Sequence, residues 1–290
     1  QDLAAKVLRT PVRPGDSFND DPLRMMRAAR FASQLEFEIA PDVLTSMKDL
    51  AHRISIISAE RVRDEFTKIM MSANPRIGIT ILVDTGLADI VLPEIPKLRL
   101  EVDEHHHHKD VYEHSITVLE QAIALEQRLG GPNLVIRIAA LLHDIGKPKT
   151  RAFIEGGGVS FHHHEVVGAR LAKKRLQALR FDNETIEAVE LLTMLHLRFH
   201  GYGEGEWTDS AVRRYVRDAG DFLTHLHVLT RADCTTRNKT KAARLSATYD
   251  SLEARIDLLM EQEELSKIRP DLDGEQVMQI LKLKPSREVG

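Results

Sequence analysis

The chain has 290 residues, of which 42% are hydrophobic, 29% are charged and 5% are aromatic, and its formal net charge is −4. This composition, with no apolar run near the ~20 residues that cross a bilayer, excludes a disordered chain, a fibre and a membrane-spanning protein, and favours about two soluble domains. The single cysteine, Cys234, excludes a disulfide framework and a cysteine-rich zinc site, and fits a reducing compartment such as the cytoplasm.

The first 96 residues are predicted to form short successive helices. Asp21 and Pro22 mark a helix start, with Asp21 as the N-cap and apolar residues following at helical spacing. Three more helices are expected: one after Pro41, one over 59–71 behind the cap Ser58, and one from Pro75 to a stop at Gly86. The acidic, proline-containing stretch 93–104 is predicted to be a linker.

Residues 97–240 are predicted to form a second helical domain, which holds most of the 14 histidines. The apolar stretch Leu134–Ile145 is expected to be a buried helix closed by Gly146 and Pro148. A small hairpin near 152–161 is the only strand material expected. Further helices are expected over 166–179, 184–195, 211–219, 223–234 and 239–264, and residues 241–290 are assigned to a long helix and the start of a tail. The predicted fold class is all-α.

Two segments of this half are strongly basic although the whole chain is acidic. Residues 165–180 and 231–244 each carry five Lys or Arg against one Asp or Glu. Such a segment is either a solvated helix face or a surface that contacts phosphate groups, and the sequence leaves both interpretations open.

His143 and Asp144 lie at the end of the apolar helix. Burying an adjacent His and Asp costs several kcal/mol unless the pair finds partners or binds a metal. Candidate partners are spread along the chain: His114, His164, His196 and Asp233. Imidazole nitrogen and carboxylate oxygen suit Mg, Mn, Ni or Zn. The six residues therefore predict a divalent metal site, the alternative being that each histidine is a satisfied core residue.

The order H…HD…H…H…D, with the runs HDIGKP at 143–148, HEVVGA at 164–169 and RAD at 231–233, resembles the HD-domain metal-dependent phosphohydrolases. The resemblance covers roughly residues 100–240. It implies that His114, His143, Asp144 and Asp233 bind one metal and that His164 and His196 bind a second, bridged by Asp144. It implies a catalytic role for Asp144, and Lys147 would steady phosphate charge. The adjacent His162 and His163 leave the choice of His164 open.

Residues 17–32 resemble the neck of bacterial CCA-adding tRNA nucleotidyltransferases and the related poly(A) polymerases. Asp20, Asp21 and Arg24 fall on their Glu/Asp-Asp-x-x-Arg motif. The resemblance implies that Asp21 and Arg24 bind the Watson–Crick edge of CTP or ATP, for which an acceptor and a forked donor are suited. Arg27 and Arg30 continue the spacing as a basic stripe for triphosphate or RNA phosphate. The alternative is a surface helix with a capping ion pair.

The likeness extends through 53–61, 84–94 and the tail residues 272–285, so it spans nearly the whole chain. These transferases carry an Asp-x-Asp pair on a strand of an N-terminal head, where it holds Mg²⁺, and the sequence predicts no strand-borne pair of this kind here; we expect the head to precede Gln1. The expected function is therefore the neck, body and HD portion of an enzyme that adds CCA to tRNA using CTP and ATP. The alternatives are a poly(A) polymerase, a free-standing HD phosphohydrolase acting on nucleotides or 2′,3′-cyclic phosphates, and an RNA-binding scaffold with a structural metal.

Overall fold

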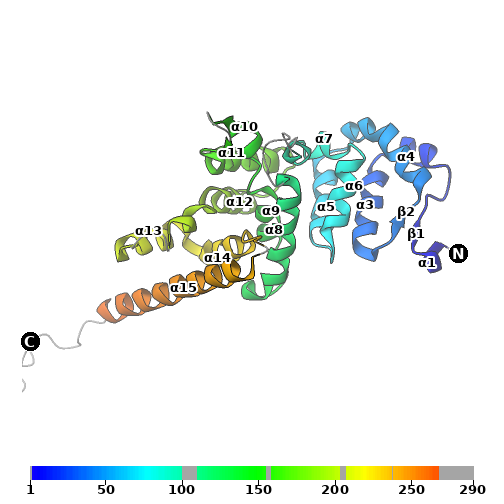
Figure 1. Cartoon of the computed structure of the whole chain (residues 1–290). Helices are drawn as coiled ribbons and strands as arrows, with labels where there is room; N and C mark the ends of the chain where they lie inside the picture. Colours follow the sequence, from blue (N-terminus) through cyan, green and yellow to red (C-terminus); the bar gives the residue numbers. More distant parts are fainter. Residues whose placement is uncertain (1, 100–109, 155–157, 203–206, 237, 268–290) are drawn as a thin grey trace, which may run out of the picture.

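The computed structural model describes residues 2–99, 110–154, 158–202, 207–236 and 238–267. These ranges are mostly helical, which confirms the all-α prediction. The helices form an elongated molecule, with the N-terminal helices at one end and the long helix α15 (Lys239–Lys267) projecting from the other (Figure 1). Within these ranges no helix is both long and apolar enough to cross a bilayer. The tail residues 272–285 lie outside them.

The N-terminal part is a cluster of short helices around an apolar core. Its elements are α1 (Asp2–Ala5), β1 (Val7–Leu8), α2 (Pro14–Asp20), α3 (Leu23–Leu35), β2 (Glu38–Ile39), α4 (Pro41–Leu50), α5 (Ala59–Met70), α6 (Pro75–Asp84) and α7 (Ala88–Val91). Short 3₁₀ helices cover 51–56 and 96–98. Ser58 caps α5 by accepting from the Arg61 backbone N–H, and Gly86 after α6 takes a positive φ of 78°, both as predicted.

Two features of this part differ from the sequence-based expectation. Asp21 lies between two helices: α2 ends at Asp20, Pro22 is the N-cap of α3, and an Asp21 carboxylate oxygen accepts from the Leu23 backbone N–H at 3.2 Å. The strands β1 and β2 pair in parallel, so the hairpin near 152–161 is not the only strand material. A two-residue strand is too short to show the alternation by which strands are recognised.

The C-terminal part is built around the apolar helix α9 (Leu134–Leu142), which packs against α8, α12 and α14. The other elements are α8 (Val111–Leu125), α10 (Lys147–Thr150), β3 (Ala152–Phe153), β4 (Val159–Ser160), α11 (His164–Ala178), α12 (Asn183–Leu195), α13 (Asp209–Ala219) and α14 (Leu223–Ala232). Short 3₁₀ helices cover 126–129, 198–201 and 220–222. β3 and β4 form the expected antiparallel hairpin. Helix α9 ends three residues before the predicted Ile145, and the chain turns before α10.

A close backbone approach joins the turn between α9 and α10 to the start of α11. A Cβ atom added to Gly146 would lie 2.7 Å from the Gly168 nitrogen and 2.9 Å from the His164 carbonyl carbon, and closer still to the His164 carbonyl oxygen. Real Cβ atoms essentially never come within 3.0 Å of such atoms. Only glycine at 146 lets these two segments meet, and both carry candidate site residues.

The buried Arg137 of α9 links the two parts of the chain. Its guanidinium donates to both carboxylate oxygens of Glu126, at 2.6 and 2.7 Å, and to the carbonyl oxygens of Met70 and Ser72, at 2.7 and 2.9 Å. Met70 and Ser72 lie at the end of α5, in the N-terminal part. The charge that interrupts an apolar sequence is therefore fully paired inside the protein.

Candidate metal centre

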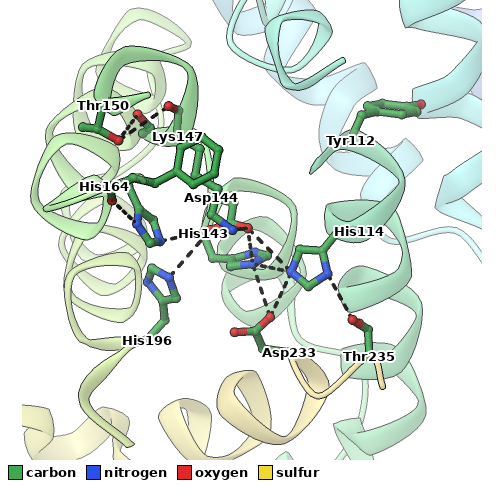
Figure 2. Close-up of polar contacts among 12 residues, drawn as sticks. Tyr112, His114, His143, Asp144, Lys147, Thr150, His164, His196, Asp233 and Thr235 are labelled. Atoms are coloured by element: carbon green, nitrogen blue, oxygen red, sulfur yellow. Dashed lines mark hydrogen bonds and ion pairs between the residues drawn. The ribbon is translucent and has the colours of Figure 1, made fainter. Parts of the chain in front are cut away.

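Six predicted ligands converge where the ends of several helices meet (Figure 2). His143 follows α9, His196 follows α12 and Asp233 follows α14, while His164 begins α11 and His114 lies within α8. Helix ends place side chains from distant parts of the sequence around one point. His143, Asp144, His164 and His196 are buried, and His114 and Asp233 are partly buried.

The first group of ligand atoms surrounds one oxygen of Asp144. Oδ2 of Asp144 lies 3.3 Å from His143 Nε2 and 3.5 Å from His114 Nε2. Asp233 Oδ1 lies 3.0 Å from His114 Nε2 and 3.7 Å from His143 Nε2. Two carboxylate oxygens and two imidazole nitrogens therefore face one small volume.

The second group faces the other oxygen of the same carboxylate. Oδ1 of Asp144 lies 3.2 Å from His164 Nε2 and 3.8 Å from His196 Nε2. The potential ligand atoms within each of the sets His114–His143–Asp144 and Asp144–His164–His196 lie within 4.8 Å of one another. Asp144 thus belongs to both groups, one oxygen toward each, which is the arrangement of a bridging carboxylate.

The outer ring nitrogens show why these histidines suit a cation. Nδ1 of His143, His164 and His196 lies 2.7 to 2.8 Å from the carbonyl oxygen three residues earlier. A carbonyl only accepts, so Nδ1 carries a proton in each ring, and Nε2 is the nitrogen that faces the centre. The buried Nε2 atoms of His164 and His196 have no hydrogen bond within the described structure. Buried nitrogens without partners are costly, and a divalent cation would satisfy them, so the donor set fits a metal.

The charges of the centre act on one another strongly. Burial opposes ionisation of Asp144, but His143, His164 and Lys147 hold its pKa well below its usual range. Burial lowers the pKa of His143, but the neighbouring Asp144 and Asp233 raise it to a net value of about 9. Burial, aided by the positive charge of His143, lowers the pKa of His196 to about 3. The centre therefore keeps its carboxylates ionised, as metal ligands must be.

Lys147 lies beside the bridging carboxylate. Its Nζ donates to Asp144 Oδ2 at 2.6 Å and lies 5.7 Å from the centre of the Phe161 ring. Lys147, which was predicted to steady phosphate charge, therefore contacts Asp144, the predicted bridging ligand, directly. His162 and His163, which left the register open, are both exposed, and the His163 side chain is 83% exposed. The structure brings His164 to the centre.

The neck residues are arranged differently from the sequence-based expectation. Arg24 of α3 pairs with Asp20, the last residue of α2, at 2.8 Å, and also donates to Ser17. Asp21 instead accepts from Arg61 of α5 at 3.2 Å. Asp21 and Arg24 were expected to act together, but each has a different charged partner. Arg61 is a neighbour that the sequence pattern did not identify.

The predicted basic stripe, Arg27 and Arg30, lies along α3, and both side chains pair with one acidic residue of α5. Arg27 Nε and Arg30 Nε lie 3.8 and 3.1 Å from the carboxylate of Glu65, which is buried. Lys68 pairs with the same carboxylate at 3.3 Å. A single buried carboxylate therefore positions three cations on the N-terminal part. Sequence reasoning missed Glu65, because its distance along the chain from Arg27 and Arg30 gives no local signal.

The two basic segments are partly neutralised within the protein. Arg175 pairs with Glu94, Lys173 with Glu190, and Arg231 with both Asp250 and Glu253. Arg170, Lys174, Lys241 and Arg244 are exposed. Some basic residues of these segments are thus engaged within the fold and others face solvent, and contact with phosphate groups stays a prediction.

Two family models match the chain. The model described as "Probable RNA and SrmB- binding site of polymerase A" matches residues 36–98, and the HD domain model matches residues 111–238. All six candidate ligands lie within the HD match.

Known relatives match the whole chain. The A-adding tRNA nucleotidyltransferase of Deinococcus radiodurans is 32% identical over 296 residues, which cover 100% of this chain and 66% of that protein. The CC-adding tRNA nucleotidyltransferase of Thermus thermophilus is 31% identical over 303 residues, which cover 100% of this chain and 64% of that protein. This chain thus spans just under two thirds of the length of these relatives.

A solved structure shares the fold. The crystal structure of the Bacillus stearothermophilus CCA-adding enzyme in complex with CTP superposes with a TM-score of 0.57 and 19% sequence identity, covering 99% of this chain and 59% of that one. The similarity extends over both the N-terminal helices and the HD part.

Proposed function

Since the chain belongs to the family of bacterial tRNA nucleotidyltransferases and poly(A) polymerases with an HD domain, we propose that it is the neck, body and HD portion of an enzyme that adds CCA nucleotides to tRNA 3′ ends. The observation that carries this proposal is the similarity, over the whole of this chain, to an A-adding and a CC-adding enzyme. The proposed division is neck and body over 1–96, HD domain over 97–240 and tail from 241. The carboxylates that hold Mg²⁺ for transfer are assigned to a preceding head.

In this proposal the neck selects CTP and ATP. Arg24 is 41% exposed and its partner Asp20 is 69% exposed, so both can exchange their mutual ion pair for a nucleotide base. Asp21 is held by Arg61 and by the Leu23 backbone N–H, which fixes its carboxylate at the start of α3. A fixed acceptor beside a forked donor suits the Watson–Crick edge of a base.

The test uses the native protein that contains this chain, with tRNA that lacks its 3′ CCA and with labelled CTP or ATP. The expected result is incorporation limited to the missing nucleotides. Arg24→Ala should change the ratio of CTP to ATP incorporation, whereas Arg9→Ala should leave it unchanged, because Arg9 pairs with Asp2 and Asp42 at the surface and lies outside the proposed nucleotide site. Wild-type protein that adds no nucleotide to tRNA would refute the proposal.

The second candidate is a poly(A) polymerase, which the match of residues 36–98 to a polymerase A binding region favours. The same assay separates the two, since a poly(A) polymerase extends an unrelated RNA with a long tail of A and does not stop after three nucleotides. A ladder of long products with ATP alone would favour this alternative.

The HD centre supports a second activity, hydrolysis of phosphoesters such as nucleotides or 2′,3′-cyclic phosphates, within the larger enzyme or as its own function. His114, His143, Asp144 and Asp233 would hold one divalent cation, and Asp144, His164 and His196 another. Such a pair of cations polarises a phosphoester and supplies a nucleophilic water. Asp144 belongs to both sets of ligands. The Lys147 ammonium, 2.6 Å from Asp144 Oδ2, is a proton donor beside them.

This activity is tested with a 2′,3′-cyclic nucleotide and added Mn²⁺ or Ni²⁺. Asp144→Ala should abolish hydrolysis because both groups lose their shared ligand, while Arg24→Ala should leave it intact. Hydrolysis that persists in Asp144→Ala would contradict the assignment. A protein that binds tRNA but neither transfers nor hydrolyses would be a scaffold, and its binding would weaken steeply with salt.

A further inference from the structure

One of the four histidines is held differently from the other three. His143 and His196 follow α9 and α12, and their Nδ1 atoms contact the carbonyl oxygens of Ala140 and Thr193, at 2.8 and 2.7 Å. These carbonyls lie in the last turn of a helix, where carbonyl groups lack partners within the helix. His164 finds the Phe161 carbonyl in the turn before α11, at 2.8 Å. Each of these rings is thus oriented by its own segment.

His114 has no such local acceptor. It lies within α8, where the carbonyl groups are engaged in the hydrogen bonding of the helix itself. Its Nδ1 instead lies 3.2 Å from the Thr235 hydroxyl oxygen, 121 residues further along the chain (Figure 2). The orientation of this ring therefore depends on a separate segment.

The Thr235 segment contacts both nitrogens of the ring. Asp233, two residues earlier, places Oδ1 3.0 Å from His114 Nε2, and the Thr235 backbone N–H donates to the Asp233 carbonyl at 2.9 Å. This tight turn fixes the spacing between the carboxylate and the hydroxyl. A hydroxyl can donate or accept, so unlike the carbonyls it permits the ring proton on either nitrogen.

We propose that Thr235 is a positioning residue for His114: its hydroxyl accepts the Nδ1–H and so directs the Nε2 lone pair into the group of His114, His143, Asp144 and Asp233. This inference rests on the proposed metal centre. It predicts that loss of the hydroxyl weakens one cation position and spares the other, because His164 and His196 have their own carbonyl partners. Loss of such an outer partner typically reduces metal affinity by roughly 10 to 100-fold.

The choice of variant follows from the surroundings. Thr235 and His114 line a cavity of about 660 Å³ together with Thr117, Gln121 and Thr236. In Thr235→Ala a water from this cavity would replace the hydroxyl. Thr235→Val keeps the shape of the side chain and removes only the hydrogen bond, and Thr235→Ser keeps the hydroxyl. Thr236→Val is the matched control, since the Thr236 hydroxyl accepts from the Asn238 backbone N–H and contacts none of the four histidines in the described structure.

The first readout is a calorimetric titration of metal-depleted protein with Mn²⁺. The wild type, Thr235→Ser and Thr236→Val should bind two cations with similar affinities, and Thr235→Val should bind one of the two roughly 10 to 100-fold more weakly. Wild-type binding of two cations together with an unchanged Thr235→Val titration would overturn the proposal.

The second readout needs no metal. Nitrogen-15 NMR of the histidine rings reports which nitrogen carries the proton. Thr235→Val should change the signals of His114 and leave those of His143, His164 and His196 with protonated Nδ1. If the wild type binds no cation, the proposed metal centre fails, and this experiment still decides the positioning role: unchanged His114 signals in Thr235→Val would refute it.

Discussion

Gly146→Ala is predicted to disturb the metal centre through the backbone alone. The added Cβ would lie 2.7 Å from the Gly168 nitrogen, whereas ordinary contacts begin near 3.4 Å, so α11 must move away by at least about 0.7 Å. His164, at the start of α11, moves with it, away from Asp144 Oδ1, now 3.2 Å from its Nε2. Ligand positions tolerate shifts of only about 0.5 Å, so the cation held by His164 and His196 should bind much more weakly.

The same movement costs stability, because forcing extra volume into a packed interior typically costs about 1–3 kcal/mol. The expected loss in the free energy of unfolding, measured by urea denaturation, falls in that range. Binding of the second cation is measured separately, by titrating the folded protein with Mn²⁺.

Gly15→Ala is the control for replacing a glycine by alanine. Gly15 lies in the first turn of α2, with no heavy atom within 4 Å of an added Cβ, so this variant should be as stable as the wild type or more stable by up to about 1 kcal/mol. A Gly146→Ala variant that retains both wild-type stability and two cations would refute the predicted displacement of α11.

Three further predictions concern stability. Arg137→Met should cost about 3–5 kcal/mol in urea unfolding, since Glu126 keeps a buried charge without its partner; a change below 1 kcal/mol would contradict this. Asp182→Ala should cost about 1 kcal/mol at neutral pH by removing the cap of α12. Hydrogen bonds from Thr185 lower the pKa of the Asp182 carboxyl from 3.8. The difference in unfolding free energy between wild type and Asp182→Ala is therefore present above pH 3.8 and should vanish as the pH falls through the lowered pKa. A difference that stays constant with pH would exclude the carboxylate as its source. Mn²⁺ at 100 times its Kd should add about 2.7 kcal/mol per site, which EDTA reverses; an unchanged melting temperature would argue against binding.

Much of the fold could be predicted because its signals are local. Ser58, Pro75 and Gly86 act within a few residues of themselves, and their helices begin and end close to the predicted positions. The parallel pairing of Val7–Leu8 with Glu38–Ile39 could not be predicted, since nothing within two residues identifies a partner about thirty residues away.

The candidate metal centre was predictable for a different reason. Its ligands lie in recognisable runs such as HDIGKP, and helix ends bring these runs together. The choice among His162, His163 and His164 needed the structure, because it depends on which residue begins α11.

The neck shows the limit of local reasoning. Spacing alone pairs Asp21 with Arg24, but the nearer partner of Arg24 is Asp20, and Asp21 pairs with Arg61 from another helix. Arg137 is a similar case, since its sequence context gives a charge in an apolar run and no indication of Glu126.

The measurement that tests the central claim most directly is the number of Mn²⁺ ions retained per chain, determined by native mass spectrometry of the folded protein. A centre bridged by Asp144 predicts two ions in the wild type, one in His196→Ala and none in Asp144→Asn at the same Mn²⁺ concentration. A wild type that retains no ion, or an Asp144→Asn variant that retains two, would contradict the shared-ligand centre.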